Sequence, residues 1–298
     1  MELSSEIQVD YLSKMNKHDR DDEITFVPEG HIYMIKGETS KPISVTTLTY
    51  KNVWAPFDAN AVITRIMDSE KYKSGNSEYS GMSKWEIKRK WDKAGEEARV
   101  EGTKLHDKIE KYYNEKMILE EKNAKRRSER LSKKRKCDDN EKEKRIEGPT
   151  DWMQFMRFAE SDIMKNMVPY RTEWKIFSRV YNIAGAIDMI FLNKDTNTLE
   201  IYDWKRSKEI SQDNYNRYAI HPVLKEYQIP DANYYKYSMQ LSVYKYILET
   251  EYDLPYKLGD MYLVRMDTNE EMEKAERIEA AYMKEEIESL LKTRVPPK

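Results

Sequence analysis

Three extended runs follow one another between residues 170 and 207, with only short turns between them. They read YRTEWKIFSRV, YNIAGAIDMIFL and TLEIYDWKRS, and each combines apolar and β-branched or aromatic side chains. Strands joined by short turns pair with one another in an antiparallel sheet. The runs therefore predict the core of a sheet, around which the other elements must pack.

The turn between the second and third runs fixes their register. With NKDTNT as the turn, Leu192 faces Leu199, and counting back sets Asp188 opposite Asp203. Lys205 lies on the same surface as both aspartates, because side chains alternate along a strand. The sequence thus predicts two carboxylates and one ammonium group on one face of the sheet.

Two facing carboxylates need a cation. Cross-strand neighbours lie about 5 Å apart, where two negative charges repel unless a cation lies between them. Carboxylate oxygens suit Mg²⁺ or Mn²⁺, and Lys205 can then assist an attacking water or stabilise charge on a phosphate. The alternative is a surface ion pair of Asp203 with Lys205, because Asp-x-Lys is a common sequence.

A long helix is predicted to begin after Ser83, a candidate N-cap. Within it, Ala98, Gly102, His106 and Glu110 recur every four residues and so form one stripe. Small residues in this stripe would allow close approach to the sheet, and the imidazole of His106 could then reach a metal ion. A packed or exposed histidine is the alternative.

Two further predicted elements carry polar side chains. On the strand TEWKIF, Glu173 shares a face with Lys175, so Glu173 either adds an oxygen ligand or forms a surface salt bridge. On the later helix YSMQLSVYKYIL, Gln240 and Tyr244 lie four residues apart. They either orient Lys205 or a phosphate, or form a polar helix edge.

The rest of the chain predicts a single domain over residues 24–298 after an N-terminal extension at 1–23. The domain is predicted to begin with a hairpin over residues 24–50 that turns at KGET. It is predicted to end with the charged helix EEMEKAERIEAAYMKEEIESLLK. Residues 117–148 form a charged insertion, basic and then mixed. This insertion is either a solvated helix or loop, or a nucleic-acid-facing arm or nuclear address.

Composition excludes several classes of protein. No apolar run approaches the roughly 20 residues of a membrane helix, and the N-terminus matches neither a signal nor a transit peptide. Cys137 is the only cysteine, which excludes an intrachain disulfide and a cysteine-rich metal site. No P-loop is present, so no nucleotide cofactor is expected. We therefore expect an intracellular protein, cytoplasmic or nuclear, with no membrane partner. The richness in Lys, Asn and Tyr is typical of proteins from AT-rich genomes, including viral ones.

Taken in order, GTKLHDKIE, TEWKIF, IAGAIDMIF, EIYDWKRSK and YSMQLSVYKYIL resemble the motifs of PD-(D/E)XK nucleases of the RecB and lambda-exonuclease type. The resemblance implies an α/β, restriction-endonuclease-like core, in which helices flank a mixed central sheet. It implies that Mg²⁺ or Mn²⁺ is bound by His106, Asp188, Asp203 and the backbone carbonyl of Trp204, while Lys205 assists the water.

The same resemblance implies further roles around this centre. Glu173 and Gln240 are expected to support catalysis. The residues expected to contact nucleic acid are Ser44, Thr46, Glu110, Arg206, Ser207 and Tyr244.

These features favour a metal-dependent DNA exonuclease acting on single-stranded or frayed-end DNA in repair, recombination or replication. Aromatic side chains such as Trp54 are predicted to stack on bases. Two alternatives stay open: a structure-specific endonuclease on flaps, branched DNA or RNA, and a non-catalytic nucleic-acid-binding module of the same fold. Digestion polarity and oligomeric state are not encoded in the predicted ligands.

Overall fold

The computed structural model describes residues 10–131, 150–214, 216–267 and 273–295. Cys137 and the part of the predicted charged insertion at 132–149 lie outside the described residues. The chain divides into two compact units, one made of residues 1–54 with 106–298 and the other of residues 55–105. Within the described ranges, no helix is both long and apolar enough to cross a membrane.

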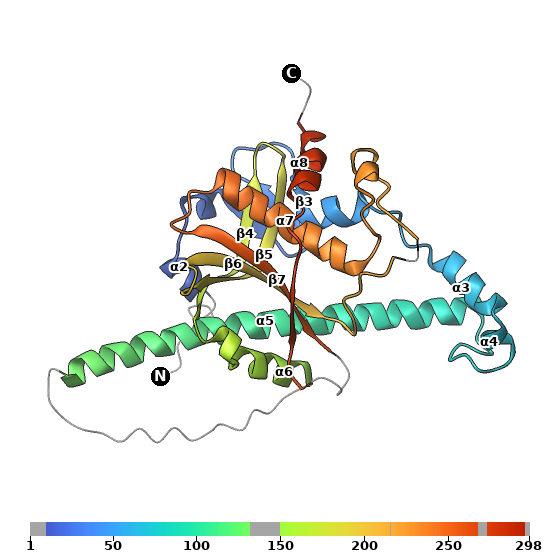
Figure 1. The fold of residues 1–298 in the computed structure, drawn as a ribbon, viewed down its shortest axis with the longest axis horizontal. Helices are drawn as coiled ribbons and strands as arrows, with labels where there is room; N and C mark the ends of the chain where they lie inside the picture. The colour runs from blue at the N-terminus through green and yellow to red at the C-terminus, as the bar shows by residue number, and fades with distance from the viewer. Residues whose placement is uncertain (1–9, 132–149, 215, 268–272, 296–298) are drawn as a thin grey trace. The chain divides into compact units, whose positions relative to one another are not determined.

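The larger unit is a mixed α/β fold built on a six-stranded sheet (Figure 1). The strand order is β3-β5-β6-β7-β8, with β4 paired to β5. The β3–β5 and β6–β7 pairs are parallel and the other pairs are antiparallel. The strands are β3 (Ile43–Ser44), β4 (Met167–Ser178), β5 (Ile183–Asn193), β6 (Thr198–Arg206), β7 (Lys257–Met266) and β8 (Glu276–Glu279).

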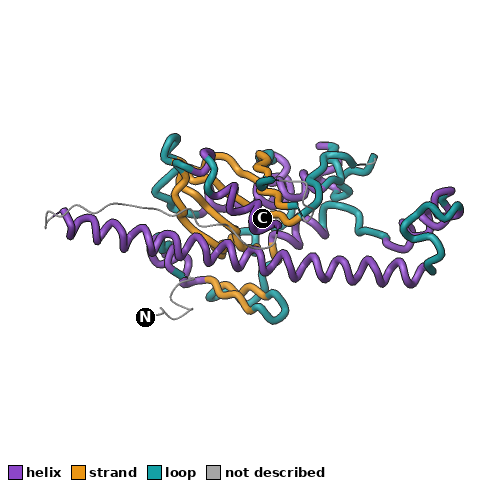
Figure 2. The backbone as a smooth tube through the Cα atoms, turned by 90° about the horizontal axis from the view of Figure 1, so that it is seen from below, coloured by secondary structure: helices purple, strands orange, loops and turns teal. Residues whose placement is uncertain are grey.

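Helices and short helical turns surround this sheet, and Figure 2 shows the strands gathered among them. The described helices of the larger unit are α2 (Tyr11–Met15), α5 (Lys84–Leu131), α6 (Thr150–Ala159), α7 (Asn233–Glu251) and α8 (Lys284–Lys292), and the first part of α5 belongs to the smaller unit. The short turns are η1 (Asp19–Glu23), η2 (Thr47–Lys51), η3 (Asp162–Met164) and η4 (Pro222–Tyr227).

The two faces of the sheet are covered by different helices. On one face, α7 and α8 bury Leu241, Ile247 and Ile287 against aliphatic side chains of the strands. On the other face the cover is aromatic: the ring of Tyr113 from α5 lies 5.1 Å from that of Phe191, and further rings come from α6. The mixed sheet with helices on both faces confirms the predicted α/β architecture.

The predicted register of β5 and β6 is confirmed, since Leu192 pairs with Leu199. The pairing ends at Met189 with Tyr202, one step before the predicted facing of Asp188 and Asp203. On its other end, β5 pairs with β3 at residues 183–184, while β4 occupies the opposite edge along the whole strand. On the edge of β5 that faces away from β4, residues 185–188 therefore pair with neither β3 nor β6. This unpaired stretch is the gap in the sheet, and Asp188 lies in it.

The N-terminal hairpin forms with a different turn from the predicted one. β1 (Ile24–Val27) pairs with β2 (Ile32–Ile35), so the chain reverses at residues 28–31 and not at KGET. Gly30 and His31 both have positive φ, at 85° and 52°, which closes the turn there. β2 ends before KGET, and β3 then joins the larger sheet.

The predicted closing helix is only half helical. Residues Glu276–Glu279 form β8, which pairs with the outer edge of β7, and α8 begins at Lys284. Pairing along a free strand edge overrides the helical preference of a Glu- and Ala-rich segment.

The smaller unit is helical. It contains α3 (Ala59–Asp68), α4 (Glu70–Lys73) and the first part of α5. Ser83 begins α5 as predicted: its hydroxyl accepts the Glu86 amide, and the Glu86 carboxylate accepts the Ser83 amide at 2.7 Å. Gly102, predicted to allow close packing, has open space around it, because an added Cβ would meet nothing within 4 Å.

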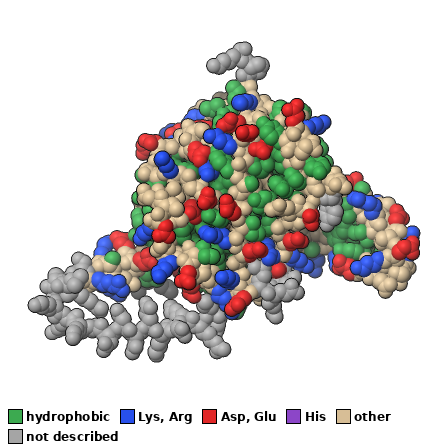
Figure 3. Space-filling model, viewed as in Figure 1, with side chains coloured by type: hydrophobic (Ala, Val, Ile, Leu, Met, Phe, Trp, Pro, Cys, Tyr) green, Lys and Arg blue, Asp and Glu red, His purple; other side chains and the backbone are tan. Residues whose placement is uncertain are grey.

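Charged side chains of both signs are interspersed over the face of the molecule drawn in Figure 3. Neither sign gathers into one continuous area on that face. This agrees with a net charge of −2 from 52 basic and 54 acidic residues. Local contacts, and not net charge, must therefore identify functional surfaces.

Candidate active site

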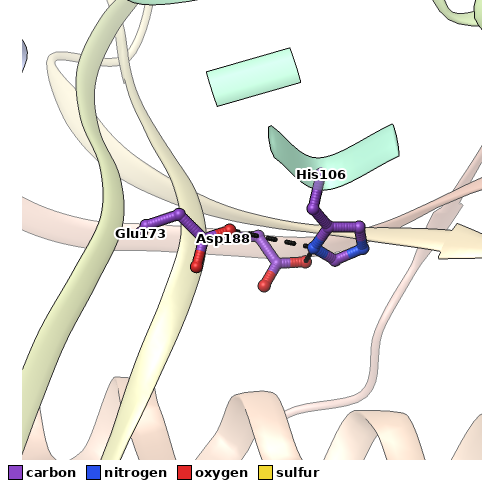
Figure 4. Close-up of side chains that lie close together, drawn as sticks. All are labelled: His106, Glu173 and Asp188. Carbon is purple, nitrogen blue, oxygen red and sulfur yellow. Dashed lines mark ion pairs between the residues drawn. The ribbon is translucent and has the colours of Figure 1, made fainter. Parts of the chain in front are cut away.

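Three side chains from three elements converge beside the gap in the sheet (Figure 4). His106 comes from α5, Glu173 from β4 and Asp188 from β5, and both carboxylates point toward the imidazole. His106 Nδ1 lies 3.5 Å from an Asp188 oxygen and 3.8 Å from a Glu173 oxygen. One ligand atom from each residue lies within 4.8 Å of the other two.

Glu173 reaches the cluster through an unusual backbone conformation. Its φ is 44°, in the left-handed region that residues other than glycine and asparagine rarely adopt. Neighbouring residues Thr172 and Trp174 pair regularly with β5 on either side of it. Strained conformations of this kind concentrate at functional sites. Alternation along the strand predicted which face Glu173 occupies, but it did not predict this local twist.

The backbone of Trp204 on β6 contacts two side chains at the gap in the sheet. The Trp204 amide donates to Asp188 Oδ2 at 2.9 Å, and the Trp204 carbonyl oxygen lies 2.9 Å from His106 Nε2. The pairing of β5 with β6 has ended at this point, so these two backbone groups of Trp204 contact side chains and not β5. The Trp204 carbonyl thus accepts a hydrogen bond from His106 Nε2, while the other ring nitrogen, Nδ1, faces the carboxylates.

Asp203 and Lys205 form a buried ion pair on the next strand. Lys205 Nζ lies 2.5 Å from Asp203 Oδ2, and their side chains are 18% and 3% exposed. Lys205 Nζ also lies 4.7 Å from the centroid of the Tyr237 ring on α7. A cation over an aromatic face is stabilised by about 0.5–2 kcal/mol. Lys205 is therefore held from two sides.

Gln240 and Tyr244 are buried and contact each other. Gln240 Nε2 donates to Tyr244 Oη at 3.3 Å. The Tyr244 ring lies against Gly185 of β5, where a Cβ would come within 2.6 Å of the ring. Among the described contacts, Tyr237 and not Gln240 reaches Lys205. Tyr237 lies one helical turn before Gln240, and this i, i+3, i+7 spacing is the signal that the sequence analysis missed.

Burial and repulsion shift the pKa values in the cluster. Burial, together with the nearby charge of Asp188, raises the pKa of Asp203 to about 6. Lys205 opposes this shift only in part. Burial also raises the pKa of Asp188, although His106 opposes the shift. For His106, burial lowers the pKa, but Asp188 and Glu173 outweigh it and raise the value to about 9. Three carboxylates thus face two cations, and a negative excess remains.

Glu110 lies one turn beyond His106 on α5. Burial raises the pKa of its carboxyl to about 7, with Glu173 raising it further and Lys175 opposing. The stripe predicted from the four-residue spacing therefore places Glu110 beside the acidic cluster. Burial is the main cause of this raised pKa, and the added repulsion from Glu173 places Glu110 at the margin of the acidic cluster.

Three of the side chains predicted to contact nucleic acid form contacts within the chain. Arg206 Nε donates to Asp151 Oδ2 of α6 at 2.7 Å. Ser207 donates to the Glu209 carbonyl, and Ser44 donates to the Thr47 hydroxyl at 2.8 Å. Thr46 is exposed. The first three side chains therefore already have partners within the chain.

The donors that converge fit a hard divalent ion. Neighbouring ligands of an octahedral Mg²⁺ site, with bonds of 2.0–2.1 Å, lie roughly 3 Å apart. His106 Nδ1, at 3.5 Å from an Asp188 oxygen and 3.8 Å from a Glu173 oxygen, comes close to that separation. One ligand atom each of His106, Glu173 and Asp188 lies within 4.8 Å of the other two, and the excess of negative charge favours a cation there. Asp203 is not in this three-residue group, and its Oδ2 pairs with Lys205.

A family model, the PD-(D/E)XK nuclease superfamily, matches residues 83–295. The match covers more than half of the chain and includes the whole cluster described above. The chain therefore belongs to the PD-(D/E)XK nuclease superfamily. It is a nuclease, a hydrolase of nucleic acid, and its mixed sheet is of the restriction-endonuclease-like type, as predicted. Nucleases of this superfamily usually use divalent metals. No curated protein matches the chain.

Proposed function

We propose that this nuclease is a Mg²⁺- or Mn²⁺-dependent DNA exonuclease that acts on single-stranded or frayed-end DNA in repair, recombination or replication. The observation that carries the proposal is the convergence of His106, Glu173 and Asp188 beside the buried pair of Asp203 and Lys205. Carboxylate and imidazole donors with an adjacent lysine suit hydrolysis of a phosphodiester by water.

The exonuclease subtype rests on sequence resemblance. The helix histidine motif, the EIYDWKRSK segment and the glutamine helix resemble nucleases of the RecB and lambda-exonuclease type. With ISVTTLT near residue 43, they also resemble the mitochondrial genome maintenance exonuclease. This likeness supports a requirement for a DNA end.

In the proposed mechanism, His106, Asp188, Asp203 and the Trp204 carbonyl would hold the ion, and Glu173 would offer a further oxygen. A bound divalent ion supplies Lewis-acid stabilisation of the charge that develops on the phosphate. Lys205 is fixed by Asp203 and by the face of Tyr237. A ring face attracts the ammonium without taking a directed hydrogen bond, so Lys205 keeps N–H donors for the attacking water or a phosphate oxygen.

The direct test compares linear and circular single-stranded DNA with Mg²⁺. The wild type is expected to degrade the linear DNA and leave the circle intact, because an end-dependent enzyme cannot load on a closed strand. Lys205→Ala is expected to lose about 10²–10³-fold in rate, as when one charge-stabilising donor is removed. The matched control is Lys208→Ala, which changes an exposed lysine three residues away.

The other outcomes each select an alternative. Cleavage of the circle supports the structure-specific endonuclease. Metal-independent binding without cleavage of any DNA or RNA supports the non-catalytic module. Equal activity of Lys205→Ala and Lys208→Ala contradicts the assigned role of Lys205.

A further inference from the structure

Trp85, at the start of α5, is the one tryptophan of the chain with an exposed side chain. It is 65% exposed, whereas the other five, all within the described residues, are buried or half-buried. Burying an aromatic side chain is strongly favourable, so an indole left in water is not explained by packing. Single exposed aromatics become informative when their neighbours also point to a ligand.

The neighbours of Trp85 are cationic. The guanidinium of Arg89, one turn later, lies 5.2 Å from the centroid of the indole. Lys84, Lys88 and Lys90 are exposed in the same two turns, against a single acid, Glu86. The Glu86 carboxylate is already bound by Ser83 at the start of the helix.

Two of these cations are not neutralised. Lys84 contacts the Thr64 hydroxyl, and Lys90 pairs with Glu78 at 2.9 Å. Lys88 and Arg89, in contrast, form no ion pair within the described part of the chain. The exposed indole is thus flanked by two free positive charges on an otherwise mixed surface.

We propose that this surface, Trp85 with Lys88 and Arg89, binds single-stranded nucleic acid: a base stacks on the indole and the cations contact the adjoining phosphates. Stacking of a base on an aromatic side chain contributes about 1–3 kcal/mol, and a duplex hides its base faces within the helix. A polyanion without planar rings, such as an acidic peptide, would meet the cations but not the indole. The inference rests on the proposed nuclease function for its choice of polyanion.

This surface replaces the base-stacking site expected from the sequence. Trp54 is 1% exposed, and Lys236 lies over its ring at 5.4 Å. A base therefore has no access to Trp54. Sequence alone could not distinguish the two indoles, because burial depends on which elements cover them.

The experiment measures binding of a fluorescein-labelled oligothymidylate to the full chain by fluorescence anisotropy, with EDTA present so that no strand is cut. Trp85→Ala is expected to weaken binding about 5- to 30-fold, within the range for loss of one stacked base. The matched control is Phe57→Ala, which removes another aromatic of the same unit that is 66% exposed. It is expected to change binding less than twofold.

A salt titration tests the cations separately. Lys88→Ala is expected to weaken binding and to reduce the slope of log K against log salt concentration by about 0.7, the value for one phosphate contact on a single strand. Trp85→Ala is expected to leave that slope unchanged.

Several results would overturn the inference: equal binding by Trp85→Ala and wild type, an equal loss in Phe57→Ala, or equal competition by polyglutamate. Tight binding of blunt duplex with the same dependence on Trp85 would also overturn it. Failure of the nuclease proposal is distinguishable, because binding is measured without hydrolysis. Trp85-dependent binding in a protein that cuts no DNA leaves this inference standing, whereas robust cleavage with Trp85-independent binding removes it alone.

Discussion

Asp21 and Asp188 are both carboxylates with little exposure near β4, but their surroundings differ. Asp21, in η1, accepts hydrogen bonds from Arg171 at 2.8 Å, Trp174 at 2.7 Å and the His18 amide at 3.0 Å. Burial acts to raise the pKa of Asp21, but these donors outweigh it and lower the pKa below 3.8. The cluster around Asp21 is closed, because its charge is balanced.

Asp188 shows the opposite behaviour. It accepts a hydrogen bond from the Trp204 amide, and it shares the gap in the sheet with Glu173 and His106. Burial raises the pKa of Asp188, and Glu173 raises it further. The comparison teaches that a folded chain of this size can balance a buried aspartate, so the unbalanced charge at Asp188 indicates a site suited to an external cation.

The same substitution at the two aspartates should separate function from stability. In Asp188→Asn, activity is expected to fall on the order of 10³-fold, since a bound ion contributes several kcal/mol to the transition state and 1.36 kcal/mol is a factor of ten. The melting temperature in EDTA is expected to rise, because the amide removes a disfavoured charge. DNA hydrolysis and thermal melting check the two effects.

Addition of Mn²⁺ sharpens this first test. At a concentration 100 times its Kd, the ion is expected to stabilise the wild type by about 2.7 kcal/mol. The melting temperature of the wild type should rise accordingly. Asp188→Asn should lose most of that increase. An unchanged response to Mn²⁺ in Asp188→Asn would contradict a metal site at this position.

Asp21→Asn should give the reverse pattern. The substitution leaves Arg171, whose side chain is 5% exposed, without its anion, and the expected loss of stability is about 2–4 kcal/mol. Urea unfolding at neutral pH measures it, while activity per folded molecule should be retained. Because the pKa of Asp21 is lowered on folding, its contribution is present above pH 3.8 and lost in stronger acid. The two proteins should therefore converge in stability as the pH falls; a constant difference would argue against the ion pair.

Sequence reasoning succeeded where local rules decide the structure. The NKDTNT turn fixed the register of β5 and β6, and alternation then placed Asp188, Asp203 and Lys205 on one face. Four-residue spacing on α5 put Glu110 beside the cluster that His106 joins. These predictions need only the periods of strand and helix.

The features that sequence reasoning missed depend on contacts between distant segments. β8 forms because β7 offers a free edge, although its residues favour a helix. Tyr237 reaches Lys205 because α7 packs across β6, and Glu173 turns inward through a backbone angle that no residue type specifies. Each of these is set by tertiary packing and not by the local pattern.

Glu110 offers the smallest and most discriminating test of the comparison, because it lies at the margin of the unbalanced cluster. Its pKa rises from 4.5 to about 7 on folding, so the folded state holds the proton more tightly than the unfolded state. The contribution of Glu110 to stability is therefore fully present below pH 4.5 and is lost as the pH rises through 7. The glutamine of Glu110→Gln carries no charge, so the variant should not show this loss. In EDTA it should be about 1 kcal/mol more stable than the wild type at pH 8, after allowance for partial solvent screening, and equally stable at pH 4. Urea unfolding across this range measures the effect, with the exposed Glu120→Gln as control. Parallel pH profiles for Glu110→Gln and wild type would show that the negative excess does not extend to Glu110, and the open cluster would then be confined to the residues around His106.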